Sequence, residues 1–105
     1  MNPLSSSRTV KLFGEAAVAK IESSKVLVVG LGGVGSFAAE AIARGGVGTL
    51  TLLDDDRIEH SNLKRQLTAL NSTIGKLKTE EMRDRILDIN PETVVDVLPI
   101  RFDNN

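Results

Sequence analysis

A polar segment at residues 52–67, LLDDDRIEHSNLKRQL, concentrates side chains that could do chemistry. Three successive carboxylates are followed by a serine, an asparagine, a glutamine and several cations. Fixed cations stabilise the negative charge that develops on phosphoryl oxygens and on departing pyrophosphate. One carboxylate is enough to hold a ribose, so the remaining polar groups need another explanation. The segment favours a site where the phosphates of a triphosphate take part in a reaction.

A glycine-rich turn, VLVVGLGGVG at residues 26–35, precedes this segment and matches the pattern G-x-G-x-x-G. Gly30 would permit the tight turn, Gly32 and Gly33 would let phosphate approach the backbone, and Gly35 would permit close packing of helix on strand. Asp54 follows at about the spacing at which an acidic side chain accepts hydrogen bonds from ribose hydroxyls. The turn predicts nucleotide binding, but NAD, FAD, S-adenosylmethionine and ATP all remain open.

The elements that must position these residues alternate between strands and helices. Apolar periodicity predicts a helix over 8–21, a strand over 25–29 that is buried on both faces, a helix over 33–44, a strand over 49–54, a helix over 76–89 and a strand over 93–100. Strands that alternate with helices form a parallel sheet with right-handed crossovers. The expected fold class is α/β, with the N-terminal half of a Rossmann-like parallel sheet in a three-layer α/β/α arrangement.

The connection over residues 55–74 is much longer than the roughly 2–6 residues usual in such units, and long connections are often functional. A short helix over 61–67 would place Asn62, Arg65 and Gln66 on one face. Asp56 could bind Mg²⁺ or orient a substrate. The lone histidine, His60, is expected to be a partly exposed loop residue.

The buried faces of the two long helices follow from the spacing of their apolar residues. The predicted buried residues are Val34, Phe37, Ala38, Ala41 and Ile42 on the first helix and Met82, Ile86 and Ile89 on the second, with Phe13 also in the core. The remaining surface expectations are a solvated Glu40, the ion pairs Glu80–Arg83 and Glu81–Arg85, and a helix stop at Asn90–Pro91.

Composition narrows the classes of function. The 105 residues carry a net charge of −1, so no overall field favours nucleic acid or membrane. The chain has no cysteine, which excludes disulfides, thiolate catalysis and cysteine zinc sites. The start of the chain lacks the apolar core of a secretory signal, so a cytoplasmic location is expected. Residues 1–7 are expected to be flexible and residues 8–105 to form one nucleotide-binding domain.

The first strand of the predicted sheet has a candidate neighbour on one side only. In a Rossmann sheet the first strand lies centrally and pairs on both sides. An apolar edge with no partner is an aggregation liability. We therefore expect that the domain is truncated, or that another chain covers this edge.

The combined motifs D-x-D, S-N-L-x-R-Q and G-x-x-K resemble the ThiF/MoeB superfamily of adenylating enzymes. The resemblance covers nearly the whole chain, from RTVKLFGEAAV to INPE. That superfamily includes ubiquitin-activating enzymes, sulfur-carrier adenylyltransferases and bacterial tRNA threonylcarbamoyladenosine dehydratases. The runs LFGE, GGVGSFAAEAIARGGVG and STIGKLK look most like the dehydratase branch, whereas SNLKRQ is closer to the wider superfamily.

The resemblance implies ATP-dependent activation of a carboxylate, with ATP and Mg²⁺ as cofactors and a homodimer as the assembly. In this reaction a carboxylate attacks the α-phosphorus of ATP to give an acyl-adenylate and pyrophosphate. The substrate would be a tRNA, or alternatively the C-terminus of a ubiquitin-like or sulfur-carrier protein. The implied ATP-site residues are Gly30, Gly32, Gly33, Gly35, Asp54, Asp56, Ser61, Asn62, Arg65, Gln66 and Lys78. Arg65 and Lys78 would be catalytic, and Arg8 would reach the ATP of the neighbouring subunit.

The superfamily pattern also contains a second half with a D-x-x-D-N-type motif, which this sequence does not include. Three other hypotheses therefore stay open beside the dehydratase. One is a carrier-protein adenylyltransferase, another is a fragment of an NAD-dependent oxidoreductase, and the third is an inactive truncated copy that dimerises.

Overall fold

The computed structural model describes residues 15–101, and the side chains of residues 19–101. The elements are α2 (Glu15–Ser23), β1 (Lys25–Val29), α3 (Gly33–Arg44), β2 (Thr49–Leu53), the 3₁₀ helix η1 (His60–Lys64), α4 (Lys78–Ile89) and β3 (Val94–Leu98). Each predicted strand is present within two residues of its expected bounds, and so are the predicted helices over 33–44 and 76–89. The predicted helix over 8–21 is described only from Glu15 onward, as α2, and ends at Ser23. Residues 1–7, expected to be flexible, the proposed site residue Arg8 and the predicted core residue Phe13 lie outside the described residues.

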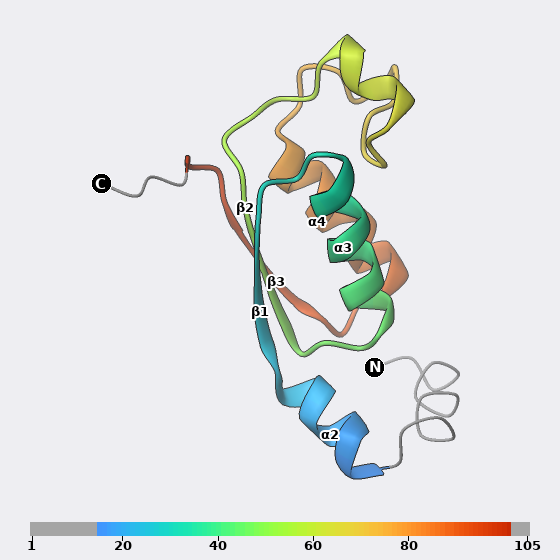
Figure 1. The fold of residues 1–105 in the computed structure, drawn as a ribbon, viewed down its shortest axis with the longest axis vertical. Coiled ribbons are helices and arrows are strands. Elements are labelled where there is room, and N and C mark those ends of the chain that lie inside the picture. The colour runs from blue at the N-terminus through green and yellow to red at the C-terminus, as the bar shows by residue number, and fades with distance from the viewer. Residues whose placement is uncertain (1–14, 102–105) are drawn as a thin grey trace.

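The three strands form one parallel sheet in the order β1-β2-β3, with Lys25 beside Thr49 and Thr49 beside Val94. Helices α3 and α4 lie side by side on one face of this sheet, and α2 lies beyond the amino end of β1 (Figure 1). The arrangement confirms the Rossmann-like α/β fold. Residues 15–101 supply two of the three expected layers, and they place β1 at an open edge. No helix in this part of the chain is long and apolar enough to cross a membrane.

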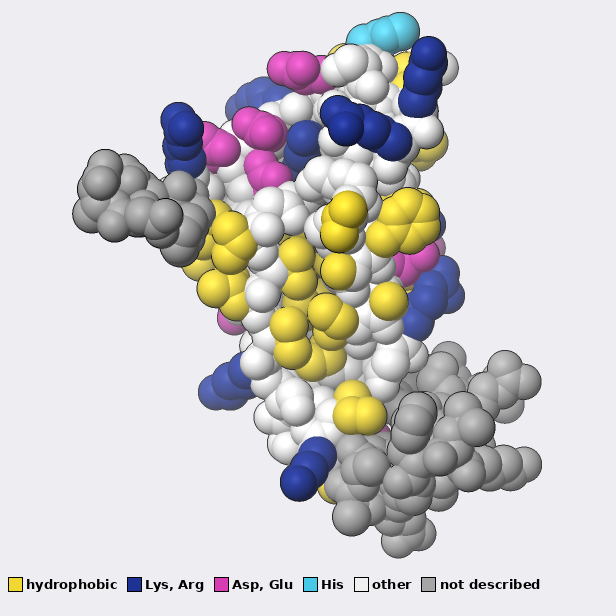
Figure 2. Space-filling view, viewed as in Figure 1, with side chains coloured by type: hydrophobic (Ala, Val, Ile, Leu, Met, Phe, Trp, Pro, Cys, Tyr) yellow, Lys and Arg dark blue, Asp and Glu magenta, His cyan; other side chains and the backbone are white. Residues whose placement is uncertain are grey.

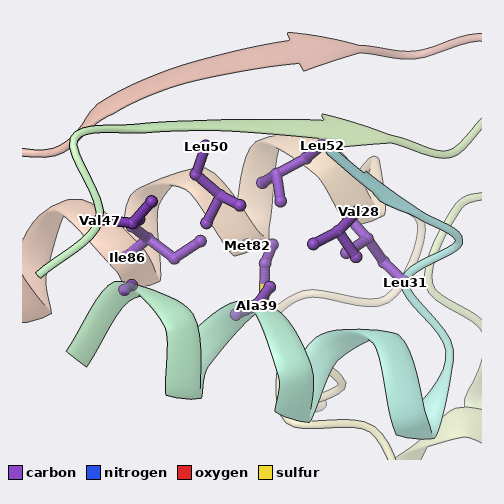
Figure 3. Close-up of a cluster of buried hydrophobic side chains, with 9 residues drawn as sticks. Val28, Leu31, Ala39, Val47, Leu50, Leu52, Met82 and Ile86 are labelled. Atoms are coloured by element: carbon purple, nitrogen blue, oxygen red, sulfur yellow. The ribbon is translucent and has the colours of Figure 1, made fainter. Parts of the chain in front are cut away.

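The hydrophobic core lies between the sheet and the two helices (Figure 3). Leu50 and Leu52 of β2 point toward Met82 and Ile86 of α4, and all four side chains are fully buried. Val28, Leu31, Ala39 and Val47 complete the cluster that Figure 3 labels. The expected burial of Met82 and Ile86 is therefore confirmed, while Ile89 is only partly buried.

The predicted buried face of α3 is wrong. Ser36, Ala39 and Ala43 face the sheet and α4, whereas Val34 and Phe37 are 87% and 58% exposed. Ala38 and Ala41 are also exposed, and Ile42 is partly buried. Small side chains at i, i+3 and i+7 let the helix lie close to the sheet, so they take the inner face although they are less apolar.

Substitution of two apolar residues should distinguish the exposed face of α3 from the core between α4 and the sheet. We expect Phe37→Ser to lower the free energy of unfolding by less than about 1 kcal/mol, because an exposed side chain loses little on truncation. Met82→Ala should cost about 2–5 kcal/mol, since it opens a cavity in the core. Urea denaturation of both variants measures the difference. Equal losses would mean that Phe37 is packed in the isolated chain.

The prediction that the strand over residues 25–29 is buried on both faces is wrong. Val28 points into the core, but Leu27 and Val29 on the opposite face are 54% and 48% exposed. Val94 and Leu98 of β3 are exposed on that same face of the sheet. Figure 2 shows apolar side chains over the middle of one face of the molecule and a group of charged side chains at its upper end. The cause is that no described helix covers the second face.

Glu40 is not solvated as expected but joins α3 to α4. Its side chain is 15% exposed and accepts a hydrogen bond from Arg85 Nε, while Arg44 Nε lies 3.6 Å from its second oxygen. The hydrogen bond from Arg85, reinforced by the charges of Arg85 and Arg44, holds the pKa of Glu40 below its ordinary value of 4.5. The predicted pairs Glu81–Arg85 and Glu80–Arg83 are not among the ion pairs of residues 15–101. Arg85 pairs with Glu40 and Glu81 with Lys76, while Arg83 pairs with Asp84.

Replacement of Glu40 should give a pH-dependent loss of stability. A carboxyl group with a lowered pKa in the folded state stabilises that state at neutral pH, and the contribution disappears as the pH falls through the folded pKa. We expect Glu40→Gln to lower the free energy of unfolding by about 1 kcal/mol at pH 7. The difference from the unmodified chain should shrink below pH 4.5, as measured by urea denaturation. The control Glu80→Gln, on the exposed side of α4, should show no such dependence.

Candidate nucleotide-binding site

The glycine turn between β1 and α3 is shaped by two of its glycines. Gly30 has a φ of +84°, a conformation that favours glycine, and its N–H donates to the carbonyl of Leu53 at 2.8 Å. A Cβ added to Gly35 would lie 1.9 Å from the carbonyl oxygen of Gly30. A Cβ on Gly32 would meet nothing within 4 Å. The turn is therefore tightly packed beneath α3 and open on the side where a phosphate could approach.

Asp54, at the end of β2, holds the turn in place. Its Oδ2 accepts the N–H of Leu31 at 2.6 Å, and its Oδ1 accepts the N–H of Asp56 at 2.7 Å. The side chain is only 9% exposed. Each carboxylate oxygen can accept a further hydrogen bond, so the expected ribose contact is compatible with this structural role.

A hollow of about 220 Å³ lies at the carboxyl ends of all three strands. It is lined by Val29, Gly30, Leu53, Asp54, Asp55, Asp56, Ile100 and Arg101. Ligands of open α/β sheets bind outside the carboxyl ends of the strands, so this is where a nucleotide would be expected. Carboxylate oxygens of Asp54, Asp55 and Asp56 lie within 4.8 Å of one another, and this oxygen-only set fits Mg²⁺.

Lys78 is the cation nearest to these carboxylates. Its side chain is 8% exposed, and its Nζ lies 3.8 Å from Oδ2 of Asp56, which is itself 67% exposed. Lys78 is also the first residue of α4, where the positive end of the helix dipole disfavours a cation. A lysine with a mostly buried side chain, whose ammonium group has one distant and exposed partner, is poorly neutralised. The arrangement suits an anion that arrives from outside the chain.

The crossover loop, residues 59–74, departs from the predicted helix over 61–67. The helix is a 3₁₀ turn that ends at Lys64, and Arg65 leaves it with a φ of −142°. Asn62 and Gln66 are therefore buried, while Arg65 is exposed and does not share their face. The expected grouping of the three residues is wrong for this reason. Ser61 is exposed on the same turn, and His60 is exposed as expected.

Asn62 organises the loop from within. Its Oδ1 accepts the N–H of Glu59 at 2.8 Å, and the Glu59 side chain accepts the N–H of Asn62, which together form a capping box. The Oε1 of Gln66 is buried without a hydrogen-bond partner in the described part of the chain. Arg65 brings its backbone carbonyl to 3.5 Å from a Cβ built on Gly33, so the loop and the glycine turn are neighbours.

The two ends of the crossover loop are held together by a feature that the sequence analysis missed. We call residues 56–58 and 75–78 the loop clip. Its backbone hydrogen bonds run from Ile58 N–H to Lys76 O (2.9 Å), from Gly75 N–H to Ile58 O (2.8 Å) and from Lys78 N–H to Asp56 O (3.1 Å). Gly75, with a φ of +88°, was the available signal, because a glycine just before a helix marks a turn. The clip fixes Lys78 beside Asp56.

The fold and the site together define a Rossmann-like α/β domain with a glycine turn of the nucleotide-binding kind. The ThiF family model matches residues 4–105, and the chain belongs to the ThiF family.

Curated relatives fall into more than one branch. The chain is 49% identical over 96 residues to the tRNA threonylcarbamoyladenosine dehydratase of Bacillus subtilis and 47% identical over 88 residues to that of Haemophilus influenzae. These matches cover 91% and 84% of this chain but only 38% and 34% of the two relatives. The molybdopterin-synthase adenylyltransferase of Salmonella typhimurium is 42% identical over 85 residues.

A solved structure agrees with the fold. The E. coli tRNA N6-threonylcarbamoyladenosine dehydratase TcdA in complex with ATP superposes with a TM-score of 0.88 at 44% identity. The match covers 90% of this chain and 39% of that one. The chain thus spans somewhat over one third of the length of these proteins.

Proposed function

We propose that this chain forms the nucleotide-binding half of the site of an ATP-dependent adenylating enzyme. A substrate carboxylate would attack the α-phosphorus of ATP, forming an acyl–phosphate bond and releasing pyrophosphate. The observation that carries the proposal is Lys78, a nearly buried cation at the carboxyl edge of the sheet with one carboxylate at 3.8 Å. A dinucleotide site has no evident use for such a cation beside its acidic ribose ligand, whereas a triphosphate does.

Each side of the site has a role in this proposal. The open turn at Gly32 and Gly33 would receive the phosphates, and Asp54 would hold the ribose. Lys78 would neutralise charge on the α-phosphate and on the departing pyrophosphate, and the exposed Arg65 would add a second cation from the crossover loop. Mg²⁺ would neutralise phosphate charge beside Asp56. Asn62 and Gln66 support the loop that carries Arg65.

For the substrate we propose the carboxylate of threonylcarbamoyladenosine in tRNA. The support is that relatives named tRNA threonylcarbamoyladenosine dehydratase reach 47–49% identity, against 42–45% for two molybdopterin-synthase adenylyltransferases. The second candidate is the C-terminal carboxylate of a sulfur-carrier or ubiquitin-like protein, and the adenylyltransferases at 42–45% identity support it. We further propose a homodimer in which Arg8 reaches the neighbouring ATP site.

Nucleotide selectivity is the first test. Isothermal titration of the chain with ATP–Mg²⁺, and separately with NADH, should show binding of ATP alone. Tight binding of NADH without binding of ATP would refute the proposal in favour of an oxidoreductase fragment.

Catalysis is tested by release of pyrophosphate. The chain is incubated with ATP–Mg²⁺ and either tRNA that carries threonylcarbamoyladenosine or a carrier protein with a free C-terminal carboxylate. Pyrophosphate release in the tRNA mixture but not in the carrier-protein mixture supports the first substrate, and the reverse result supports the second. Binding of ATP without release in either mixture would assign the chain a nucleotide-binding role without independent turnover.

A further inference from the structure

Arg57 makes a contact that none of the expected site roles explains. Its side chain is exposed, and its Nη1 donates a hydrogen bond to the carbonyl of Gly75 at 2.9 Å. Within residues 15–101 this is the one hydrogen bond from a side chain to the backbone across the loop clip. Because Arg57 is exposed, it contributes little to the core, and the effect of its contact must be sought in the loop clip itself.

The carbonyl that Arg57 holds belongs to the turn that leads into α4. Gly75 has a φ of +88°, and the helix begins three residues later at Lys78. Glycine can adopt this conformation without strain but is also the residue that leaves it most readily. A guanidinium bond to the Gly75 carbonyl restricts the orientation of the following peptide, and so restricts where the helix, and Lys78 with it, begins.

Lys78 depends on this restriction. Its backbone N–H donates to the carbonyl of Asp56 at 3.1 Å, and its Nζ lies 3.8 Å from the Asp56 carboxylate. Both contacts span the loop clip, so a shift between the two halves of the clip would move the ammonium group away from the carboxyl edge of the sheet.

We infer that Arg57 is a positioning residue, which acts through the loop clip to place Lys78 for the phosphates of ATP. The inference rests on the proposed function for its ligand, but not for its structural part. Arg57 does not itself contact the phosphates in this scheme. The effect of Arg57 on affinity must therefore pass through Lys78.

A double-mutant cycle tests this path. Arg57→Ala should weaken ATP–Mg²⁺ binding about fivefold, as expected for one lost hydrogen bond that orients a charged group. In a Lys78→Ala background the same change should have almost no effect, because the group that it positions is gone. Arg57→Lys, which keeps a donor of similar reach, should recover most of the lost affinity. An equal loss in both backgrounds would overturn the inference and place Arg57 directly on the phosphates.

Hydrogen exchange of the ligand-free chain tests the structural part independently. Arg57→Ala should speed exchange of the backbone N–H groups of Ile58, Gly75 and Lys78 about fivefold while that of Leu50 is unchanged. Unchanged exchange in the clip would overturn the inference even if ATP affinity fell. If the unmodified chain failed to bind ATP, the proposed function would fail, and the exchange data alone would decide whether Arg57 positions Lys78.

Discussion

Lys78→Ala should weaken ATP–Mg²⁺ binding by about 30- to 100-fold, which corresponds to roughly 2–3 kcal/mol for a buried, charge-assisted contact. The reason is that Lys78 is the buried cation at the carboxyl edge of the sheet, where phosphate would otherwise meet the carboxylates of Asp54 and Asp56. Isothermal titration measures the change. The matched control is Lys25→Ala, an exposed lysine at the amino end of β1, which should leave the affinity unaltered.

Removal of the charge of Lys78, with its aliphatic stem kept, should not destabilise the fold. Burial of a lysine at the start of a helix costs free energy, and its partner Asp56 is mostly exposed and can be rehydrated. Lys78→Met, which keeps the aliphatic stem, should therefore unfold at the same urea concentration as the unmodified chain or at a higher one. Loss of affinity together with a clear loss of stability would instead make Lys78 a structural residue.

Gly35→Ala should lower the free energy of unfolding by about 3 kcal/mol or more, because its new Cβ would lie 1.9 Å from the backbone oxygen of Gly30. No flexible side chain can yield there, so the start of α3 must move away from β1. Urea denaturation and the intensity of the helical circular dichroism signal measure the effect.

Gly32→Ala is the matched control for this prediction. The residue has a φ of −72°, which alanine adopts, and the added methyl group meets nothing within 4 Å. Stability should change by less than about 1 kcal/mol. Affinity for ATP should nevertheless fall, since the methyl group would stand where the phosphates are proposed to approach. Equal destabilisation by the two alanines would show that the turn is not packed as described.

Local patterns were sufficient to predict the order and the bounds of the main elements. The run KVLVV, the glycines after it and the stop at Asn90–Pro91 are signals that act within a few residues, and they appear in the structure where they were expected. The positions of the glycine turn and of Asp54 could also be predicted from local patterns, because a strand, a turn and a helix in succession leave few ways to arrange them.

Burial was predicted less well because it depends on which partners a surface meets. Apolar spacing alone placed Val34 and Phe37 inside, yet the close approach of α3 at Gly35 favours the small residues Ser36 and Ala39 on the inner face. The burial and pairing of Glu40 could not be predicted from local spacing either, since its partner Arg85 lies 45 positions away in sequence. The loop clip joins two segments that are distant in sequence, and Gly75 is the sequence signal that was available for it.

The loop clip has a consequence for how this region can vary. The two ends of the crossover loop are joined by backbone hydrogen bonds, so the clip holds them together whatever the length of the segment between them. Closure entropy grows slowly with length, at about 0.6 kcal/mol for each doubling of a flexible loop. The exposed residues 71 and 72 at the tip of the crossover loop can thus change in length and sequence at modest cost, whereas Arg65 is held by its proposed role and Gln66, Thr68, Ala69 and Thr73 are held by burial. Such changes at the tip would leave the ammonium group of Lys78 in its place, because the clip holds both ends of the loop.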